Sequence, residues 1–272
     1  MPILRRLVDR GFDVHACDAS ADALADLERR GVRVQRRAAI SGLAYSRVLL
    51  CLPDPAAALS VIGNWIAQGL PAGTTIGDIT TMSPSTARKH ARLVADAGGD
   101  YLDVPVSGGQ RGAESGDIVV LAGGSASGFG AMLSVLQAMG STVHHVGDVG
   151  AASLVKAVHQ HVYLSYNLAF AQGLRLGREL GLPEGAVMDV LTKGAAAHSL
   201  INDRLPVALG SAFRDGFLLK RCLKDLDCLE LPEGLVSPAR DAHEHLSGIV
   251  REAVESGMGE LDILALSGKA PG

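Results

Sequence analysis

Short apolar runs alternate with amphipathic segments along the first 150 residues of the chain. Each run is bounded by turn residues and has the length of a buried strand, which is shorter than a typical helix. The runs are FDVHACD (12–18), SRVLLCLP (46–53), TTIGDI (74–79), YLDVPV (101–106), DIVVLAG (117–123) and TVHHVG (142–147).

Helix start and stop signals occupy the segments between these runs. Proline favours the first turn of a helix, serine its N-cap, and glycine the position just after its last turn. The helices marked in this way run from Pro2 to Gly11, from Ser20 to near Gly31, and from Ser83 to Gly98. Strands that alternate with helices predict an α/β domain with a parallel sheet and crossover helices.

The pattern changes near Gly150, after which only helical periodicity is found. Apolar helical segments are expected from Ala151 to about Leu180, after Pro183, within 218–231, and from about Ser237 to Ser256. The chain is therefore expected to fold as an α/β domain over residues 1–149 and an all-α domain over residues 150–272.

Composition narrows the class of partner. The formal net charge is -4 and aromatic residues make up 4% of the chain, which argues against a nucleic-acid binder. No charged segment followed by an apolar one marks a signal peptide, and no apolar run is long enough for a membrane span. A soluble, cytoplasmic protein is expected, with no membrane partner.

The four cysteines lack the C-x-x-C spacing of redox and zinc motifs. They are Cys17, Cys51, Cys222 and Cys228, and the first two lie in the apolar strand-like runs. Reduced, buried thiols are therefore expected.

Asp18 ends the first apolar run, at the edge of the sheet where open α/β folds bind ligands. A carboxylate there accepts hydrogen bonds from both ribose hydroxyls of NAD and repels the 2′-phosphate of NADP, and Ala19 offers no compensating charge. A Rossmann-like domain that prefers NAD is expected, with NADP left open. The alternative is an aspartate that opens a turn.

A G-x-G-x-x-G loop should precede this strand, because glycine amides must approach the pyrophosphate closely. The motif is absent from the 272 residues. The chain opens inside the helix that such a loop would feed, which predicts that the first strand and the loop are lost or were omitted from the gene model. The Rossmann-like domain is accordingly expected to be N-terminally truncated.

Ser107, Gly108 and Gly109 follow the fourth apolar run. They supply a hydroxyl and unhindered backbone N–H groups that suit a carboxylate ligand. The alternative is an ordinary glycine turn.

Lys156 lies within the mostly apolar segment 150–163. In a helix, His159, Gln160 and Tyr163 follow it at i+3, i+4 and i+7, so that the four polar groups share one face. Such a lysine either extends its ammonium group to water or is desolvated. Desolvation brings the pKa of a lysine towards neutrality and suits it to exchange a proton with a substrate hydroxyl. The company of His159 and Gln160 favours this second interpretation.

Metal catalysis is not expected. His159 and His161 are two residues apart on the helix and point in different directions, and His144 and His145 are neighbours on a strand. Neither pair has the geometry to share one metal ion.

Lys224 and Asp225 form a second charged pair, in the segment 218–231. On a helix facing a cleft, Lys224 would hydrogen-bond the nicotinamide ribose or the substrate, and Asp225 would fix the helix. The alternative is a solvated ion pair.

These motifs, taken in order, resemble the β-hydroxyacid dehydrogenase family. The family includes 3-hydroxyisobutyrate dehydrogenase, tartronate semialdehyde reductase, L-threonate dehydrogenase and the larger 6-phosphogluconate dehydrogenase. The matching segments are CLPDPAAA (51–58), GDITTMSP (77–84), DVPVSGG (103–109), GDVGAASLVKAVHQ (147–160) and LKDLD (223–227). The resemblance implies an oxidoreductase that transfers a hydride between NAD(P) and a small hydroxy acid of the 3-hydroxyisobutyrate type.

The resemblance also implies a role for each matched residue, with Lys156 as the catalytic acid and base. The implied substrate-binding residues are Ser107, Gly108, Gly109, His159 and Gln160. The implied cofactor-binding residues are Asp18, Leu52, Pro53, Thr81 and Lys224.

Two departures from the family pattern bear on function. The usual asparagine three residues after the lysine is His159, and the usual glycine after GDVG is Ala151. Histidine at that place resembles the 6-phosphogluconate and threonate-type members, so a sugar acid is the alternative substrate class. The rival interpretation is a truncated, non-catalytic relative that binds hydroxy acids or acts as an oligomeric partner. The resembled enzymes are oligomers, so a homodimer or homotetramer is expected.

Overall fold

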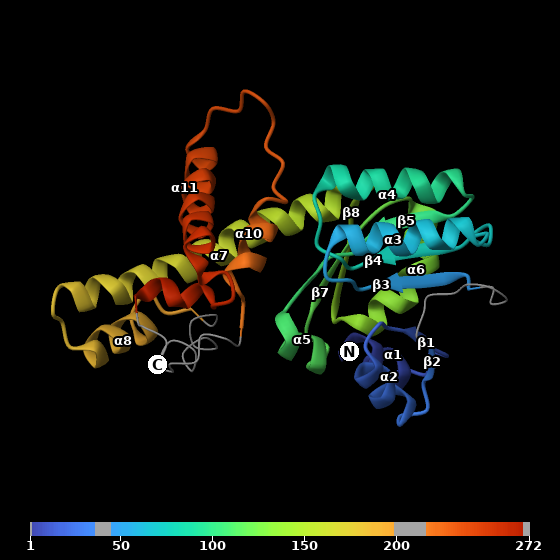
Figure 1. Cartoon of the computed structure of the whole chain (residues 1–272), viewed down its shortest axis with the longest axis horizontal. Coiled ribbons are helices and arrows are strands. Elements are labelled where there is room, and N and C mark those ends of the chain that lie inside the picture. Colours follow the sequence, from blue (N-terminus) through green and yellow to red (C-terminus); the bar gives the residue numbers. More distant parts are fainter. Residues whose placement is uncertain (1, 36–44, 199–215, 269–272) are drawn as a thin grey trace. The chain divides into compact units, whose positions relative to one another are not determined.

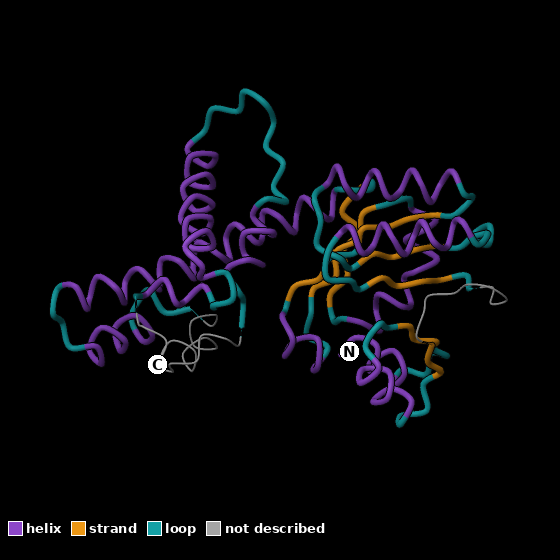
Figure 2. Tube along the Cα trace, viewed as in Figure 1, coloured by secondary structure: helices purple, strands orange, loops and turns teal. Residues whose placement is uncertain are grey.

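The computed structural model describes residues 2–35, 45–198 and 216–268 (Figure 1). The chain forms two compact units, residues 1–156 and residues 157–272. The first is a sheet with helices and the second is helical (Figure 2). The α/β fold class with a Rossmann-like first part and an all-α second part is therefore confirmed.

The strands of the first unit follow the apolar runs of the sequence. Their bounds are His15–Cys17 (β1), Arg33–Gln35 (β2), Arg47–Leu50 (β3), Thr75–Asp78 (β4), Asp100–Asp103 (β5), Val106–Ser107 (β6), Val119–Gly123 (β7) and Thr142–Gly147 (β8). β2 was not expected, because its three residues contain two polar ones and show no apolar run. The single expected run 101–106 forms two strands, β5 and the short β6.

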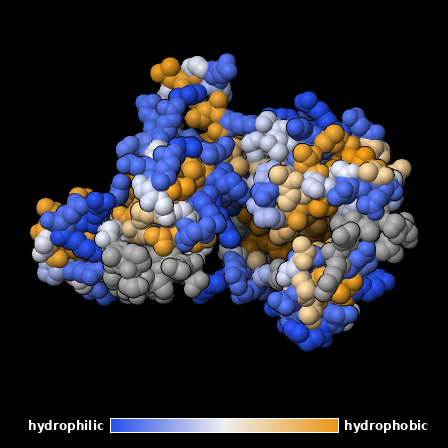
Figure 3. Space-filling view, in the orientation of Figure 1, coloured by the Kyte–Doolittle hydropathy of each residue, from blue (hydrophilic) through white to orange (hydrophobic). Residues whose placement is uncertain are grey.

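These strands form two separate sheets. β3, β4 and β5 pair in parallel, as expected, and β1 pairs in parallel with β2 in a sheet of its own. β7 runs antiparallel to β5 and β6, and parallel to β8. The reversal at β7 follows from its short connection to β6, which is too short for a full crossover. Among the described strands β3 pairs only with β4. Apolar surface is exposed in a hollow alongside β3, on the face of the molecule seen in Figure 3.

The helices of the first unit begin and end where the capping residues indicate. Their bounds are Pro2–Asp9 (α1), Ala21–Glu28 (α2), Pro55–Ala67 (α3), Pro84–Asp96 (α4), Gly109–Ser115 (α5) and Ala126–Met139 (α6). The Ser20 side chain accepts a hydrogen bond from the amide of Ala23, and Ser83 does so from Thr86, as N-caps do. Gly11 has φ 82°, the left-handed conformation expected after a helix.

The larger sheet is buried on both faces. Along β5, Tyr101 packs into a cluster with residues of α3 and α4, and the next residue, Leu102, packs on the opposite face with residues of α6. Alternation of this kind is the period-2 geometry of a strand. The sheet therefore presents its strand ends, and not its faces, to any ligand.

The helices that follow in the described part of the chain differ widely in length, from 8 residues to 29. Their bounds are Ala151–Glu179 (α7), Glu184–Lys193 (α8), Leu219–Leu226 (α10) and Pro238–Ala253 (α11), followed by a π-turn at Val254–Met258 and a 3₁₀ turn at Ile263–Ser267. An isolated bridge between Leu218 and Asp262 is a departure from the helix-only pattern. None of the described helices has the length and apolar character needed to cross a membrane.

The cysteines differ in part from expectation. All four are free thiols, and Cys222 and Cys228 are buried as predicted. Cys17 and Cys51 are exposed, so the prediction that they are buried is wrong. Cys17 is the last residue of β1 and Cys51 directly follows β3, so both lie at strand ends and not within the buried part of a strand.

A partly buried histidine pair joins α7 to α11 in the second unit. The Nδ1 atoms of His243 and His161 are 3.3 Å apart, and His243 is 8% exposed. Burial, and then the neighbouring His161 ring, lower the pKa of His243, whereas Asp227 and Glu244 act in the opposite direction. Protonation of His243 is therefore less favourable in the folded chain than in the unfolded chain.

A folded-state pKa below the unfolded value of about 6.5 means that stability is present above that pH and is lost as the pH falls below it. We expect the urea concentration at the unfolding midpoint to decrease as the pH is lowered from 7.5 to 5.5. The His243→Gln variant should show a smaller decrease over the same pH range. His245→Gln, an exposed histidine on the same helix, is the matched control and should keep the original slope. Equal slopes in all three proteins would contradict the assignment.

Candidate functional site

The predicted cofactor loops lie at the carboxyl ends of neighbouring parallel strands. Leu52 and Pro53 follow β3, and Thr81 lies in the turn between β4 and α4. Because β3 and β4 pair in parallel with Leu50 opposite Asp78, the two turns lie at the same edge of the sheet. This is the edge at which open α/β sheets bind ligands.

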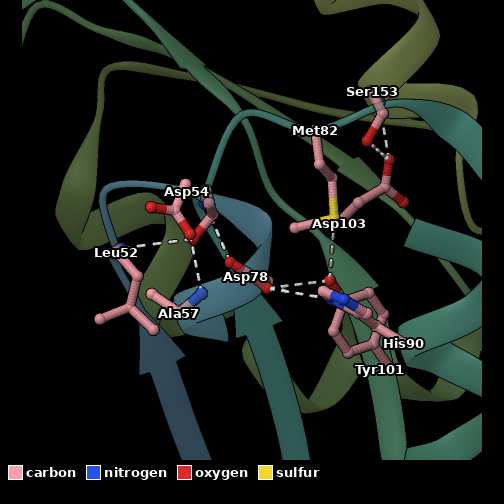
Figure 4. Close-up of polar contacts among 10 residues, drawn as sticks. Leu52, Asp54, Ala57, Asp78, Met82, His90, Tyr101, Asp103 and Ser153 are labelled. Carbon is pink, nitrogen blue, oxygen red and sulfur yellow. Dashed lines mark hydrogen bonds and ion pairs between the residues drawn. The ribbon is translucent and has the colours of Figure 1, made fainter. Parts of the chain in front are cut away.

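A buried carboxylate, Asp78, connects these turns (Figure 4). Its side chain is 0% exposed; Oδ1 accepts from the amide of Thr80 at 2.9 Å, and Oδ2 accepts from the hydroxyl of Tyr101 at 3.0 Å. The buried His90 places its Nδ1 3.9 Å from the same Oδ2. The hydroxyl of Thr80 in turn accepts from the amide of Leu52 at 3.3 Å. The β3 turn is thus tied to the β4 turn through side chains that have no access to water.

Tyr101 is held in its neutral form by this arrangement. Burial, and then the negative charge of Asp78, raise the pKa of the Tyr101 hydroxyl well above its usual range. The hydroxyl therefore remains a donor to the carboxylate at any working pH. A buried carboxylate is tolerated when such donors satisfy its oxygens.

A second buried carboxylate, Asp103, anchors the start of α7. Its Oδ1 accepts from the amide of Gly150 at 2.8 Å, and its Oδ2 accepts from the amide and hydroxyl of Ser153 at 2.6 Å and 2.7 Å. Asp103 is 1% exposed and lies 47 residues before Gly150 in the sequence. It serves the free N–H groups of the first helical turn as an N-cap residue would, from another element.

Burial raises the pKa of Asp103, and the hydrogen bonds from Gly150 and Ser153 oppose that effect. The close approach also depends on a glycine in β7. A Cβ at Gly123 would lie 2.5 Å from Asp103 Oδ1 and 3.0 Å from the amide of Ala152. β7 must therefore lack a side chain at Gly123 for the Asp103 carboxylate to contact the start of α7.

The Ser107–Gly109 turn lies four residues beyond Asp103 and requires its glycines. Gly108 has φ 138°, and a Cβ there would lie 2.8 Å from Ile118 Cγ2. Gly109 has φ 64°, a conformation that side chains disfavour even though open space surrounds it. Both glycines are exposed, so their backbone groups are accessible.

Lys156 lies in the second turn of α7, close to the anchored end of the helix. It is 9% exposed, so its ammonium group is not extended into water. Gln160, one turn on, is 4% exposed, whereas His159 is exposed. The side chain of Lys156 is therefore enclosed, and its role as the proton-transfer group stays a prediction.

The second unit holds a third buried carboxylate, Asp225, on α10. It is 6% exposed, and its Oδ2 accepts from Gln160 Nε2 at 2.6 Å. Lys224 Nζ lies 3.4 Å from its Oδ1. The Lys224–Asp225 pair is therefore not a fully solvated ion pair, because the acidic partner is enclosed.

Asp18 directly follows β1 and is exposed. Its Oδ1 accepts from the amide of Ser20 at 2.8 Å, so the residue does open the turn that leads into α2. This contact uses one carboxylate oxygen, and the position at a strand end is the one expected for a ribose-binding acid.

The sequence reasoning did not identify Asp78 and Asp103 as part of the site, and it gave Asp225 only a supporting role. Each is an acidic residue within or beside an apolar run, which is a usable signal for a buried, partnered carboxylate. Their partners on other elements, Tyr101 for Asp78, Gly150 for Asp103 and Gln160 for Asp225, lie far away in sequence and could not be named. Across residues 2–35, 45–198 and 216–268, no three His, Cys, Asp or Glu side chains cluster as a metal site requires.

Comparison with known proteins covers both parts of the chain. The NAD-binding domain of 6-phosphogluconate dehydrogenase matches residues 1–147, and the NAD-binding domain of NADP-dependent 3-hydroxyisobutyrate dehydrogenase matches residues 150–266. 2-(Hydroxymethyl)glutarate dehydrogenase of Eubacterium barkeri is 30% identical over 233 residues, which are 83% of this chain and 76% of that protein.

Two further relatives mark the range of the similarity. The Mycobacterium tuberculosis 3-hydroxyisobutyrate dehydrogenase structure with L-serine is 26% identical, with a TM-score of 0.81 and coverage of 98% of this chain and 94% of that one. The human cytokine-like nuclear factor N-PAC is 26% identical over 91% of this chain. This chain spans about half of that relative, 46% of its length.

Loss of the Asp103 carboxylate should destabilise the first unit. In Asp103→Ala the amides of Gly150 and Ser153 lose their buried acceptor, which is expected to lower the free energy of unfolding by about 2 to 4 kcal/mol. Urea unfolding followed by circular dichroism measures the change. Asp148→Asn, an exposed acid beside the same helix, is the control. If both variants unfolded at the same urea concentration, Asp103 would not anchor α7.

Proposed function

Since this chain belongs to the β-hydroxyacid dehydrogenase family, a family of NAD(P)-dependent oxidoreductases that act on CH–OH groups, we propose that it interconverts a small hydroxy acid and its oxo acid with NAD. The observation that carries the proposal is the burial of Lys156 on the helix that Asp103 anchors to β5. β5 continues into the Ser107–Gly109 turn, so one rigid unit holds both the proposed proton-transfer group and the proposed carboxylate site.

We propose that residues 1–149 bind the dinucleotide and that residues 150–272 form the substrate and dimerisation domain. Asp18 would accept from the adenosine ribose, and the turns at Leu52, Pro53 and Thr81 would line the dinucleotide along the strand ends. Lys224 would hydrogen-bond the nicotinamide ribose or the substrate. Bound NAD supplies the acceptor, and NADH the donor, of the hydride.

On the substrate side, we propose that Ser107, Gly108 and Gly109 bind the carboxylate. The left-handed glycines leave their backbone N–H groups unhindered, and the serine adds a hydroxyl donor. His159 and Gln160 would contact the remainder of the substrate.

The proposed chemistry at the carbinol requires one proton-transfer group. Lys156 removes the hydroxyl proton when the acid is oxidised and returns it when the oxo acid is reduced. An enclosed amine suits this role because it can exchange a proton with a hydroxyl group beside it. The substrate class is a small hydroxy acid of the 3-hydroxyisobutyrate type, with a sugar acid such as threonate as the alternative that His159 suggests.

One observation favours a second candidate function. The 272 residues contain no G-x-G-x-x-G motif, the element whose amides contact the pyrophosphate. The alternative is a non-catalytic relative that keeps the hydroxy-acid site, and the similarity to a nuclear factor shows that likeness of this kind is not confined to proteins named as enzymes.

We also propose a homodimer or homotetramer built on α7. An exposed apolar stripe on this helix occupies an arc of about 120° at 3.6 residues per turn. Its residues are Leu154, Val155, Val158, Val162 and Tyr166, which are 42% to 51% exposed. An exposed apolar stripe of this extent is typical of an interface. A second copy of the chain is the proposed occupant.

Lys156→Ala should lower kcat by about 10² to 10⁴-fold and leave NAD affinity nearly unchanged, because the lysine acts on the substrate proton. Steady-state assays with 3-hydroxyisobutyrate, glycerate, threonate and 6-phosphogluconate measure kcat, and calorimetry measures NAD affinity. Lys89→Ala, an exposed lysine on α4, should retain full turnover. Unchanged turnover in Lys156→Ala would remove this lysine from the mechanism.

The calorimetric measurement on the original chain also separates the two candidate functions. Micromolar NAD affinity supports the dehydrogenase, whereas millimolar or undetectable affinity supports the non-catalytic alternative.

Light scattering at micromolar concentration should give a dimer or tetramer. Placing charge in the stripe with Val158→Lys and Val162→Lys together should give a monomer, because an unpaired ammonium group in an interface is costly. Leu93→Lys, an exposed apolar position on α4, should leave the mass unchanged. A monomeric original chain would overturn the proposal.

A further inference from the structure

A series of three hydrogen-bonded side chains connects α10 to α7 within the second unit. Asp225 Oδ2 accepts from Gln160 Nε2 at 2.6 Å, and Gln160 Oε1 lies 3.0 Å from His159 Nδ1. Asp225 and Gln160 are buried, and His159 is exposed at the end of the series. The series therefore runs from an enclosed carboxylate to an imidazole on the surface of this unit.

The carboxylate determines which way the glutamine amide points. An ionised carboxylate only accepts hydrogen bonds, so Gln160 must turn its NH₂ group towards Asp225. Its carbonyl oxygen then faces His159, and a carbonyl oxygen only accepts. The other carboxylate oxygen, Asp225 Oδ1, lies 3.4 Å from Lys224 Nζ.

The acceptor at Gln160 in turn determines the state of the imidazole. His159 must donate from Nδ1, so in its neutral form Nε2 carries the lone pair. Neutral histidine in water favours the opposite tautomer, with the proton on Nε2. The His159 ring is also stacked on Tyr163, with centroids 6.2 Å apart and planes 13° apart, which restricts its rotation.

We propose that Asp225 is a positioning residue that, through Gln160, holds His159 in the Nδ1–H tautomer and so makes its Nε2 a hydrogen-bond acceptor. Such an acceptor recognises a hydroxyl donor. This consequence rests on the proposed function: the substrate that fits is a hydroxy acid with a further hydroxyl group, more than one whose remaining carbon chain is apolar.

The ring nitrogens report the tautomer directly. In the full chain labelled with ¹⁵N-histidine at pH 8, spectra that correlate ring nitrogens with ring protons should show His159 protonated at Nδ1, with the signals assigned by loss in His159→Asn. In Asp225→Asn the amide partner no longer requires one orientation, and the signals should move towards the Nε2–H pattern. Asp227→Asn, which removes an exposed charge two residues away, is the matched control and should leave them unchanged.

Gln160→Met provides a second route to the same result if Asp225→Asn does not fold. Loss of the carbonyl acceptor should also return His159 to the Nε2–H tautomer. An Nε2–H signal in the original chain, or an unchanged Nδ1–H signal in either folded variant, would overturn the proposal.

Kinetics test the consequence for substrate choice. Asp225→Asn should lower kcat/KM for threonate about tenfold, the effect of one lost hydrogen bond of about 1.4 kcal/mol, and lower that for 3-hydroxyisobutyrate less than threefold. Asp225→Glu, which keeps the carboxylate, should recover part of the loss. A chain without turnover would refute the proposed function and leave the tautomer measurement to decide the positioning role.

Discussion

The start of α7 depends on one buried interaction, the contact of the Asp103 carboxylate with the backbone of Gly150 and Ser153. A helix N-terminus carries unsatisfied N–H groups and partial positive charge. A carboxylate from a neighbouring strand accepts hydrogen bonds from these groups and compensates the charge. β5 leads through Pro105 into the turn at Ser107. The same contact therefore ties the strand that carries this turn to the helix that carries Lys156. The site in the first unit is thus organised by a residue that need not touch any ligand.

Buried aspartates repeat this device in different places of the described chain. Asp78 connects the turns after β3 and β4, Asp103 joins β5 to α7, and Asp225 joins α10 to Gln160. Each enclosed carboxylate makes two or more polar contacts, which is what makes its burial tolerable. Charge-assisted hydrogen bonds are directional as well as strong, so they set the orientation of the groups they bind more narrowly than apolar packing does. This chain therefore orients the groups around its proposed site with buried, partnered carboxylates.

Much of this organisation was predictable from local patterns. Serine caps placed the starts of α2 and α4, apolar runs placed most strands, and the mostly apolar surroundings of Lys156 indicated a helix in which the lysine is enclosed. The antiparallel direction of β7 was not predictable from local patterns. It depends on the length of the connection from β6 and not on the composition of that connection. The exposure of Cys17 and Cys51 was missed for a related reason: an apolar run does not reveal where its strand ends. The partners that connect these aspartates to other elements lie 23 to 65 residues away in sequence, beyond any periodicity.

Gly123 limits which positions around this arrangement can vary in sequence. The space that a methyl group would need is already filled by an oxygen of Asp103 and by the backbone of Asp148 and Ala152. Variation that adapts such a protein to new substrates is consequently channelled away from this strand end. It is free to accumulate in the surface turns and along α7, where the chemistry of recognition can drift while the scaffold behind it stays the same.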